Sequence, residues 1–423
     1  MIALAITFAV LLFAGVPIAF ALGLSGAAGL VSSHFMLVGV PSRMFTGIDS
    51  FVLLAAPFYI LAGELMNRGG VTKRLIRFAT IVTRGLRGGT AFANIFASVL
   101  FAGISGTAIA DTAALGQIFI KGMPEEGYSK EYAAAITVAS SVIGPIIPPS
   151  VIMVIYAAVA QMSVIDLFLA GIGPGLLLGV AVAAVVWWDA RRGRLPLTEI
   201  AVARHELPKL GLDTALVVSL PTFIVLGTLS GAFTATEAGG IAVIYAALLG
   251  WFVFKSLNHR EVWASLIISG RTTATLFLLV GAATVLSYVL ALTGATNVLK
   301  GLASVFQGEP TLFMFAVMGL LLIAGCFLDP GAAIVLLVPL LIPISRAIGI
   351  PDLQFSIFTI LTLTVGLITP PVGVCLFVAC RIGDIDVWRL VRTLFPFLLA
   401  ELVVVISMIF VPEIATWLPN VLR

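Results

Sequence analysis

Two short segments decide the fold of this chain: GPIIPPS at residues 144–150 and GLITPP at residues 366–371. Each interrupts an apolar stretch that is long enough to cross a membrane. Proline removes a backbone donor and glycine loosens the chain, so we expect a helix to break at both places. Unpaired backbone groups are tolerated at membrane depth only where they are buried in protein or line a cavity. Two such breaks in corresponding halves of a chain are typical of a secondary transporter's binding site.

The composition predicts a polytopic membrane protein. Of the 423 residues, 61% are hydrophobic and 10% are charged, and the mean hydropathy is +1.18. Soluble domains carry about 25% charged residues. We interpret the apolar opening, residues 1–30, as a first span, because it lacks a basic start and is too long for a cleaved signal peptide.

The chain shows no motif of a catalytic or nucleotide-binding site. It has no P-loop, nucleophile elbow or dinucleotide fingerprint, and its three histidines lack metal-ligand spacing. Cys326, Cys375 and Cys380 lie in apolar segments, where we expect small buried side chains and no disulfide framework. The sequence therefore predicts neither an enzyme nor a nucleic-acid-binding protein, and it predicts no cofactor.

Basic residues predict the orientation. By the positive-inside rule, loops rich in Lys and Arg face the cytoplasm. This rule places the N-terminus in the cytoplasm and the C-terminus in the periplasm, with Arg346 as an exception on the outer side. The four basic groups are Arg68, Lys73, Arg74, Arg77, Arg84 and Arg87; Arg191, Arg192, Arg194, Arg204 and Lys209; Lys255, Arg260 and Arg271; and Arg381, Arg389 and Arg392.

This orientation predicts two re-entrant helical hairpins. Residues 88–122 begin and end beside cytoplasmic loops, yet they are too apolar for a loop and carry the polar GISGTAIAD at 103–111. Residues 310–345, with GCFLDPG at 325–331, form a second hairpin that enters from the opposite face. Each hairpin precedes one broken helix, and unbroken spans fill the rest. The broken helices cover 129–161 and 353–382, and the spans cover 165–188, 212–231, 236–255, 262–291 and 394–418.

These landmarks recur at a constant distance. Pro149 and Pro371 differ by 371 − 149 = 222, and Gly144 and Gly366 differ by 366 − 144 = 222. An odd number of crossings separates the two broken helices, so the two repeats are inverted. Inverted repeats with broken helices are an architecture of alternating access. We therefore predict an all-α transporter that works by alternating access. The same distance relates Gly103 to Gly325, Gly127 to Gly349 and Thr107 to Asp329.

We divide the chain into scaffold and transport segments on this basis. Residues 68–87 read at helical spacing as an amphipathic helix, which we interpret as an arm between the two units. The segments are 1–87, the N-terminal scaffold spans and arm; 88–161, the first transport repeat; 162–291, scaffold spans and a second arm at 256–270; 292–382, the second transport repeat; and 383–423, the C-terminal scaffold span.

Four segments together resemble one family. They are RMFTGIDSFVLLAAPFYILAGELMNRGG at 43–70, GISGTAIADTAALG at 103–116, GPIIPPS and GLITPPVG. The chain is similar over almost its whole length to the large, DctM-like membrane subunit of tripartite ATP-independent periplasmic (TRAP) transporters. This resemblance implies a sodium-driven elevator transporter for carboxylate-bearing solutes such as C4-dicarboxylates or sialic acid. It also implies a small four-helix membrane subunit, expected here as a separate chain, and a soluble periplasmic substrate-binding protein.

Hairpin tips and broken helices supply the carbonyl and hydroxyl oxygens that sodium prefers. Helix C-terminal ends favour a cation and helix N-terminal ends favour an anionic substrate. We expect Na⁺ to be the coupling ion and the only metal. The candidate ligands of a first ion are Ser105, Gly106, Thr107 and Gly144, and those of a second ion are Gly325, Asp329, Gly366 and Thr369. Alternatively, these Ser and Thr hydroxyls bond back to their own helices.

Two acidic residues stand out within the hairpins. A carboxylate at the bilayer centre costs about 2.5–3.5 kcal/mol or more, so Asp329 is expected to face a cation. Its Asp-Pro dipeptide is also typical of a helix cap, and both roles are compatible. Asp111 either caps a helix or pairs across the bundle. The substrate is expected near Ser105, Ser150 and Thr369, with Ser150 opening a half-helix.

Other functions remain open at this point. A stand-alone carboxylate or anion symporter or antiporter of the same architecture would work without a receptor. A channel or a membrane scaffold is a further alternative, although neither needs matched hairpins from opposite faces. An intramembrane enzyme is disfavoured, because no catalytic dyad or metal cluster is visible.

Overall fold

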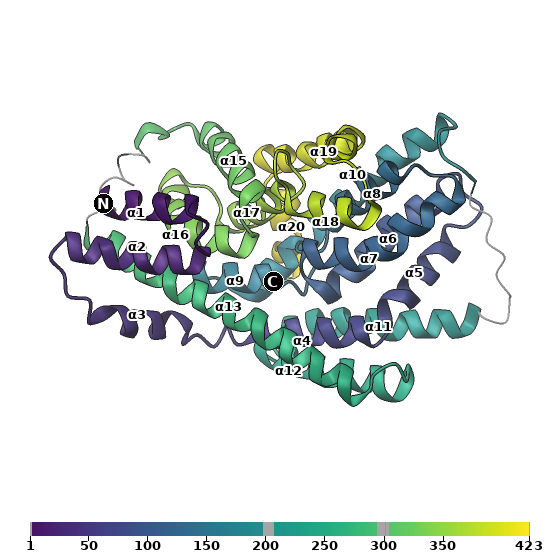
Figure 1. The fold of residues 1–423 in the computed structure, drawn as a ribbon, viewed down its shortest axis with the longest axis horizontal. Coiled ribbons are helices and arrows are strands. Elements are labelled where there is room, and N and C mark those ends of the chain that lie inside the picture. The colour runs from purple at the N-terminus through teal and green to yellow at the C-terminus, as the bar shows by residue number, and fades with distance from the viewer. Residues whose placement is uncertain (1, 198–206, 294–300, 302–303, 423) are drawn as a thin grey trace.

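Helices make up the structure, as the composition predicted. The computed structural model describes residues 2–197, 207–293, 301 and 304–422, and these contain no β-strand. Arg204, a member of the second basic group, lies outside the described residues. The helices before the first hairpin are α1 (Ile2–Phe13), α2 (Ile18–Ser32), α3 (Gly39–Ile48), α4 (Ala55–Arg68) and α5 (Val71–Val82) (Figure 1).

The first predicted hairpin and the first predicted break are both confirmed. α6 (Gly89–Ser105) and α7 (Ala108–Gly122) form the hairpin, and α8 (Lys130–Ser141) and α9 (Val151–Ala160) are the two halves of the broken helix. Capping residues set these boundaries, because each has a hydroxyl that accepts a hydrogen bond from the first turn. Ser129 caps α8 and Ser150 caps α9 in this way.

The second hairpin and the second broken helix repeat this arrangement. They consist of α15 (Pro310–Phe327), α16 (Pro330–Ile348), α17 (Asp352–Gly366) and α18 (Val374–Gly383). These helices start 310 − 89 = 221, 330 − 108 = 222, 352 − 130 = 222 and 374 − 151 = 223 residues after α6, α7, α8 and α9. The repeat that was read from single glycines and prolines therefore extends to whole helices.

The helices α6 to α9 and the helices α15 to α18 pack both within their own set and on the other set. Within each set, the first hairpin arm packs on the first half-helix, α6 on α8 and α15 on α17. Between the sets, α7 packs on α18 and α16 packs on α9. Figure 1 shows the two hairpins toward opposite sides of the molecule, with α9, α17 and α18 between them. The core lies there, and every residue of α17 from Gln354 to Gly366 is buried.

The other α-helices in the described part of the chain are α10 (Val164–Arg191), α11 (Leu207–Leu229), α12 (Ala235–Leu248), α13 (His259–Leu292), α19 (Val387–Phe410) and α20 (Glu413–Leu422). α13 runs diagonally across the molecule and packs on α2, α3 and α4 (Figure 1). α10 packs mainly on α20, α19 and α6, and α19 packs mainly on α8, α10 and α17. Among the described residues, seven helices are long and apolar enough to cross a membrane: α10 to α13, α15, α16 and α19.

The prediction of a single first span in residues 1–30 is wrong. α1 ends at Phe13 and α2 begins at Ile18, and the two helices pack side by side. Gly15 between them adopts a φ of +77°, and Pro17 directly precedes α2. A glycine tolerates this left-handed conformation and a proline cannot donate to the preceding turn, so the chain reverses here.

The last predicted span, residues 394–418, also ends earlier than expected. α19 stops at Phe410, and α20 starts at Glu413. The reason is Pro412, because the residue before a proline is pushed out of the helical region, and Val411 has φ −126° and ψ 82°. Residues 387–410 therefore form the apolar helix, and a short separate helix follows.

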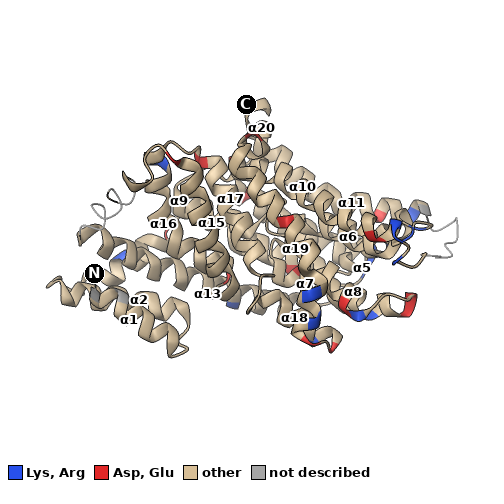
Figure 2. Cartoon of the chain, turned by 90° about the horizontal axis from the view of Figure 1, so that it is seen from above, with Lys and Arg blue, Asp and Glu red and all other residues tan. Residues whose placement is uncertain are grey.

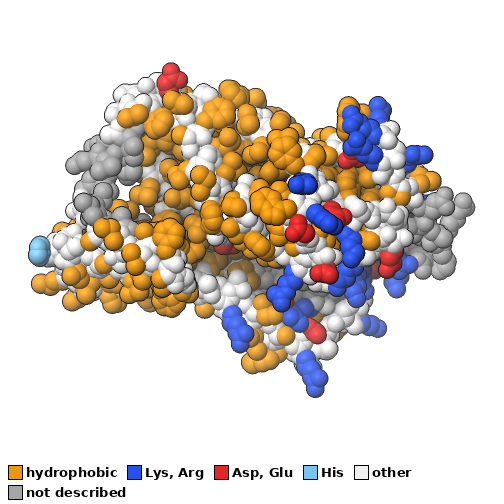
Figure 3. All heavy atoms as spheres, turned by 45° about the horizontal axis from the view of Figure 1, so that its top comes forward, with side chains coloured by type: hydrophobic (Ala, Val, Ile, Leu, Met, Phe, Trp, Pro, Cys, Tyr) orange, Lys and Arg blue, Asp and Glu red, His pale blue; other side chains and the backbone are white. Residues whose placement is uncertain are grey.

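The expected amphipathic helix within residues 68–87 is present as α5. Its apolar side packs on α6, and Val71, Leu75 and Ala79 are buried there. Arg74 on its polar side forms an ion pair of 3.2 Å with Asp213 of α11. Lys and Arg gather at the end of the molecule that carries α5, α8 and α18 (Figure 2). Hydrophobic side chains cover most of the remaining face shown in Figure 3.

Candidate functional site

The tip of the first hairpin lies directly on the first break. Gly106 between α6 and α7 has a φ of +63°, and a Cβ on it would lie 3.1 Å from the Val151 amide nitrogen. A Cβ on Gly103 would lie 3.1 Å from the Pro148 carbonyl oxygen. Both positions need glycine, because backbone approaches backbone too closely for a side chain. The hairpin tip thus meets the interrupted part of the helix, where backbone groups are available.

Two residues of the first ion set, Ser105 and Gly144, come together with Asp111 at this tip. The Ser105 hydroxyl donates a hydrogen bond to Oδ1 of Asp111. Oδ2 of Asp111 has no hydrogen-bond partner among the described residues, and the side chain is fully buried. That oxygen faces Gly144 in the break so closely that a Cβ there would clash with it. The site therefore contains a carboxylate oxygen that lacks a neutralising partner.

Thr107 of the first ion set and Ser150 of the expected substrate site have local roles. Thr107 caps α7 and accepts a hydrogen bond of 3.4 Å from the Ala110 amide. Ser150 is fully buried and accepts a hydrogen bond of 3.3 Å from the Met153 amide. Both hydroxyls thus bond to their own helices, as the alternative reading proposed, while their remaining lone pairs can still meet a cation or a water molecule.

The second ion set is joined through backbone contacts. A Cβ on Gly366 would lie 2.7 Å from the Cα of Gly325, so α15 and α17 touch at these two glycines. The Cys326 thiol donates a hydrogen bond of 3.2 Å to the Thr369 carbonyl oxygen and accepts one of 3.3 Å from the Val372 amide. Cys326 thereby fastens the second hairpin tip to the second break, a role that its apolar surroundings in the sequence did not reveal.

Asp329 and Thr369 use their side chains locally. Oδ1 of Asp329 accepts a hydrogen bond of 2.9 Å from the Gly331 amide and caps α16, with Pro330 at the first helical position. The Thr369 hydroxyl donates to the Val365 carbonyl oxygen at 2.8 Å. Asp329 is exposed at the tip. The predicted cap is therefore present, and the second carboxylate oxygen is not needed for it.

A ladder of buried hydroxyl and amide groups holds the first hairpin to α8. The Asn94 amide donates to Thr137 at 2.7 Å, and Ser98 donates to Ser140 at 2.8 Å. Thr112 of α7 adds a third rung by donating to Ser141 at 2.8 Å. All six side chains are fully buried. Hydrogen bonds of this kind join helices inside membranes, each contributing about 0.6–2 kcal/mol.

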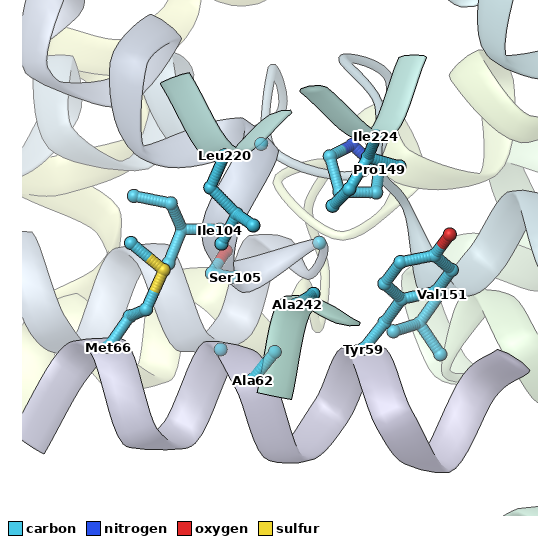
Figure 4. A pocket seen from close by; sticks show the side chains of 13 residues that line it. Tyr59, Ala62, Met66, Ile104, Ser105, Pro149, Val151, Leu220, Ile224 and Ala242 are labelled. Carbon is cyan, nitrogen blue, oxygen red and sulfur yellow. The ribbon is translucent and has the colours of Figure 1, made fainter. Parts of the chain in front are cut away.

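The first hairpin tip faces a wall of α4, α11 and α12 (Figure 4). The wall is apolar and includes Met66, Leu220 and Ala242. Gly63 of α4 approaches so closely that a Cβ there would lie 2.5 Å from the Ile104 carbonyl oxygen. The cavity left between tip and wall is about 10 Å³. This is the space of about one water molecule, too little for an organic acid.

A much larger cleft of about 470 Å³ lies between α13 and the second hairpin. Its lining includes Asp49 after α3, Gln161 after α9 and Ser287 of α13, opposite Val335 and Pro339 of α16. The cleft therefore separates the α3–α13 group from the helices of both repeats. It provides polar groups and enough volume for a small organic molecule.

The hairpin tips and the breaks contain hydroxyl, carboxylate and backbone oxygen atoms. Among the described residues, no three His, Cys, Asp or Glu side chains are grouped so as to hold a metal ion. A further buried carboxylate, Glu401 of α19, has no hydrogen-bond partner for either oxygen in the described part of the chain, and the sequence reading had passed over it.

The comparisons with known proteins agree with this architecture. A crystal structure of the Alcanivorax borkumensis YdaH transporter matches with a TM-score of 0.65 and 16% identity, over 90% of this chain and 88% of that chain. The large permease protein SiaM of a Vibrio cholerae sialic acid TRAP transporter is 37% identical over 97% of this chain and 96% of its own length. DctM, a C4-dicarboxylate TRAP large permease of Pseudomonas aeruginosa, is 36% identical over 94% of this chain and 93% of its length.

A family model covers almost the entire sequence. It is described as the DctM component of tripartite ATP-independent periplasmic transporters and matches residues 5–414. The relatives are named as transporter permeases and not as enzymes, which confirms the sequence prediction. The resemblance first noticed in four short segments thus extends along the whole chain. This protein belongs to the DctM family, the large permease subunits of TRAP transporters.

Proposed function

We propose that this protein imports an organic acid by sodium-coupled elevator transport, with a periplasmic substrate-binding protein delivering the substrate. Its relatives are named for sialic acid, C4-dicarboxylates and 2,3-diketo-L-gulonate, all of which bear carboxylates. The partners in this proposal are that binding protein and a small membrane subunit on a separate chain. The location is the bacterial inner membrane, with a cytoplasmic N-terminus and a periplasmic C-terminus.

One observation carries the proposal: Oδ2 of Asp111 is buried, unpaired and directed at the first break. A buried carboxylate without a partner is costly, and a bound cation removes that cost. Ser105 orients the other carboxylate oxygen, and the Ser141 carbonyl oxygen lies 3.2 Å from the position that a Cβ at Gly144 would take. We therefore add Asp111 to the proposed ligands Ser105, Gly106, Thr107 and Gly144.

A second sodium ion is proposed at Gly325, Asp329, Gly366 and Thr369. The contact between the two glycines brings the ends of α15 and α17 together, and helix carboxyl ends favour a cation. The substrate is proposed beside Ser105, Ser150 and Thr369, where its carboxylate meets the amino end of α9. The 470 Å³ cleft is the proposed route to this place.

The packing suggests which helices move. The two hairpins and the two broken helices exchange partners, so they form one unit, and α10 and α19 pack on that unit. In this proposal α10 and α19 travel with the transport unit, whereas the sequence reading had placed them in the scaffold. The scaffold then consists of α1 to α4 and α11 to α13, and the inverted repeats supply the two alternating states.

Uptake in proteoliposomes tests the proposal. The large subunit, its small subunit and the neighbouring periplasmic binding protein are combined with a radiolabelled carboxylate that the binding protein recognises. We expect uptake only when all three proteins and an inward sodium gradient are present. A potassium gradient of the same size is the matched control. Uptake by the large subunit alone would favour a stand-alone symporter, and uptake unaffected by sodium would refute the coupling ion.

Asp329 offers a way to separate capping from ion binding. Asparagine caps a helix about as well as aspartate, but it carries no charge. If Asp329 faces the second ion, we expect Asp329→Asn to raise the sodium concentration for half-maximal uptake about tenfold, with unchanged thermal stability. Sodium titration of uptake measures this. An unchanged titration would leave Asp329 as a cap only and remove it from the ion site.

A further inference from the structure

A second polar cavity, of about 520 Å³, lies at the opposite ends of the helices that form the core. Its walls are the turn before α8 with Tyr128, the end of α10 with Trp188 and the first half of α19 with Phe397. The first break follows the other end of α8, at Ser141. The cavity shares no lining residue with the proposed ion and substrate sites.

The charge of this cavity is positive. Arg192, Arg194 and Arg392 line it, and Asp189 is the single acidic residue in the lining. Asp189 forms an ion pair of 3.1 Å with Arg194, which leaves the other two guanidinium groups in excess. The Arg192 guanidinium lies 4.6 Å from the centre of the Trp188 ring. A planar guanidinium in this setting is well suited to a phosphate, because it offers paired donors.

The walls add an uncommitted hydroxyl and an apolar border. The Tyr132 hydroxyl is buried and has no hydrogen-bond partner among the described residues, and its ring packs on Phe397 with centres 5.8 Å apart. Trp188 and Phe395 beside the cavity are 53% and 55% exposed. Exposed aromatic rings next to arginines are typical of the level of lipid headgroups. A ligand here would meet charge at one end and apolar surface at the other.

We propose that this cavity binds the phosphate headgroup of an anionic phospholipid. The guanidinium groups of Arg192 and Arg392, which form no ion pair within the described residues, and the Tyr132 hydroxyl contact the phosphate oxygens. The acyl chains lie along the exposed apolar side of α19, where Leu399 and Val403 are 46% and 64% exposed. Basic cavities between membrane helices bind such headgroups. A free phosphate would satisfy the charge but leave the apolar surface unused, which favours the lipid.

Native mass spectrometry of the full chain in detergent tests this site. We compare dioleoylphosphatidylglycerol with dioleoylphosphatidylcholine, and the wild type with the Arg192→Gln/Arg392→Gln double variant. Phosphatidylglycerol is expected to bind the wild type more tightly than phosphatidylcholine, and the double variant is expected to bind it about tenfold more weakly. The matched control, Arg260→Gln/Arg271→Gln on α13, removes the same charge elsewhere and is expected to bind like the wild type.

Inorganic phosphate distinguishes the two sources of the ligand. A thermal shift with phosphatidylglycerol that inorganic phosphate does not reproduce supports the lipid site, whereas equal stabilisation by both refutes it. Equal binding of the two lipids, or equal loss in both double variants, also overturns the proposal. Tyr132→Phe removes only the hydroxyl and is expected to keep the fold. It therefore provides a second test of the site if the arginine variants fail to fold. It is expected to weaken phosphatidylglycerol binding alone, and unchanged binding would contradict the proposed contact.

Discussion

Replacing Asp111 by asparagine is expected to lower sodium-driven uptake about 100-fold, with the protein still folded. Asparagine keeps the volume and can still accept from Ser105, but it removes the charge that faces Gly144. Losing one partner of a buried charge interaction costs about 3 kcal/mol, which corresponds to roughly a 100-fold weaker ion affinity. Uptake as a function of sodium concentration, together with sodium-dependent thermal stability, measures the effect.

The control for this variant is Asp384→Asn. Asp384 is an exposed residue after α18 with a φ of +52°, a conformation that asparagine also tolerates. It should leave both uptake and its sodium dependence unchanged. If Asp111→Asn behaves in the same way as Asp384→Asn, Asp111 does not bind the ion. The unpaired Oδ2 of Asp111 then no longer supports the proposed function.

Replacing Gly325 by alanine is expected to disrupt the second hairpin. The added Cβ would collide with the Leu363 carbonyl oxygen and lie 3.1 Å from the Cα of Gly366. Both neighbours are backbone atoms, which cannot turn away as a side chain can. Overpacking costs about 1–3 kcal/mol in a core, and we expect the upper end here. Thermal unfolding in detergent should therefore occur at a lower temperature, and uptake should be lost.

Gly319→Ala on the same helix is the matched control. Nothing lies within 4 Å of a Cβ at Gly319, so the substitution meets open space. Alanine favours a helix over glycine by up to about 1 kcal/mol, so stability should be equal or slightly higher. Equal behaviour of the two variants would show that the contact between α15 and α17 contributes little to the fold.

Much of the fold could be predicted because a membrane forbids unpaired backbone. The Gly and Pro clusters at 144–150 and 366–371 therefore identified the broken helices, and the polar centres of 103–111 and 325–331 identified the hairpin tips. The wrong prediction of a single first span at Gly15 and Pro17 also concerns a helix interrupted by glycine and proline. Gly15 and Pro17 also break a helix, but they are only two residues. The long apolar sequence around them therefore resembled one continuous span.

The site was less accessible to sequence reasoning. Asp111 was considered only as a cap or a partner across the bundle, because its distance from Gly144 depends on how the hairpin lies on the break. The hydrogen bonds from Asn94 and Ser98 to α8 are indicated in the sequence only by two polar residues four positions apart in an apolar helix. Such spacing shows that one face is polar, but it does not say which helix receives that face.

The hairpin arms are attached to the first half-helices by different means, α6 and α7 to α8 through side chains and α15 to α17 through main chain. This difference has a consequence for motion. The three rungs between the first hairpin and α8 can be replaced one at a time by water, because each hydroxyl finds a new partner there. Water cannot replace the contact between Gly325 and Gly366 in this way, because it consists of backbone atoms that touch each other. The arms of the first hairpin can thus loosen from α8 in stages, whereas α15 and α17 separate all at once or remain in contact.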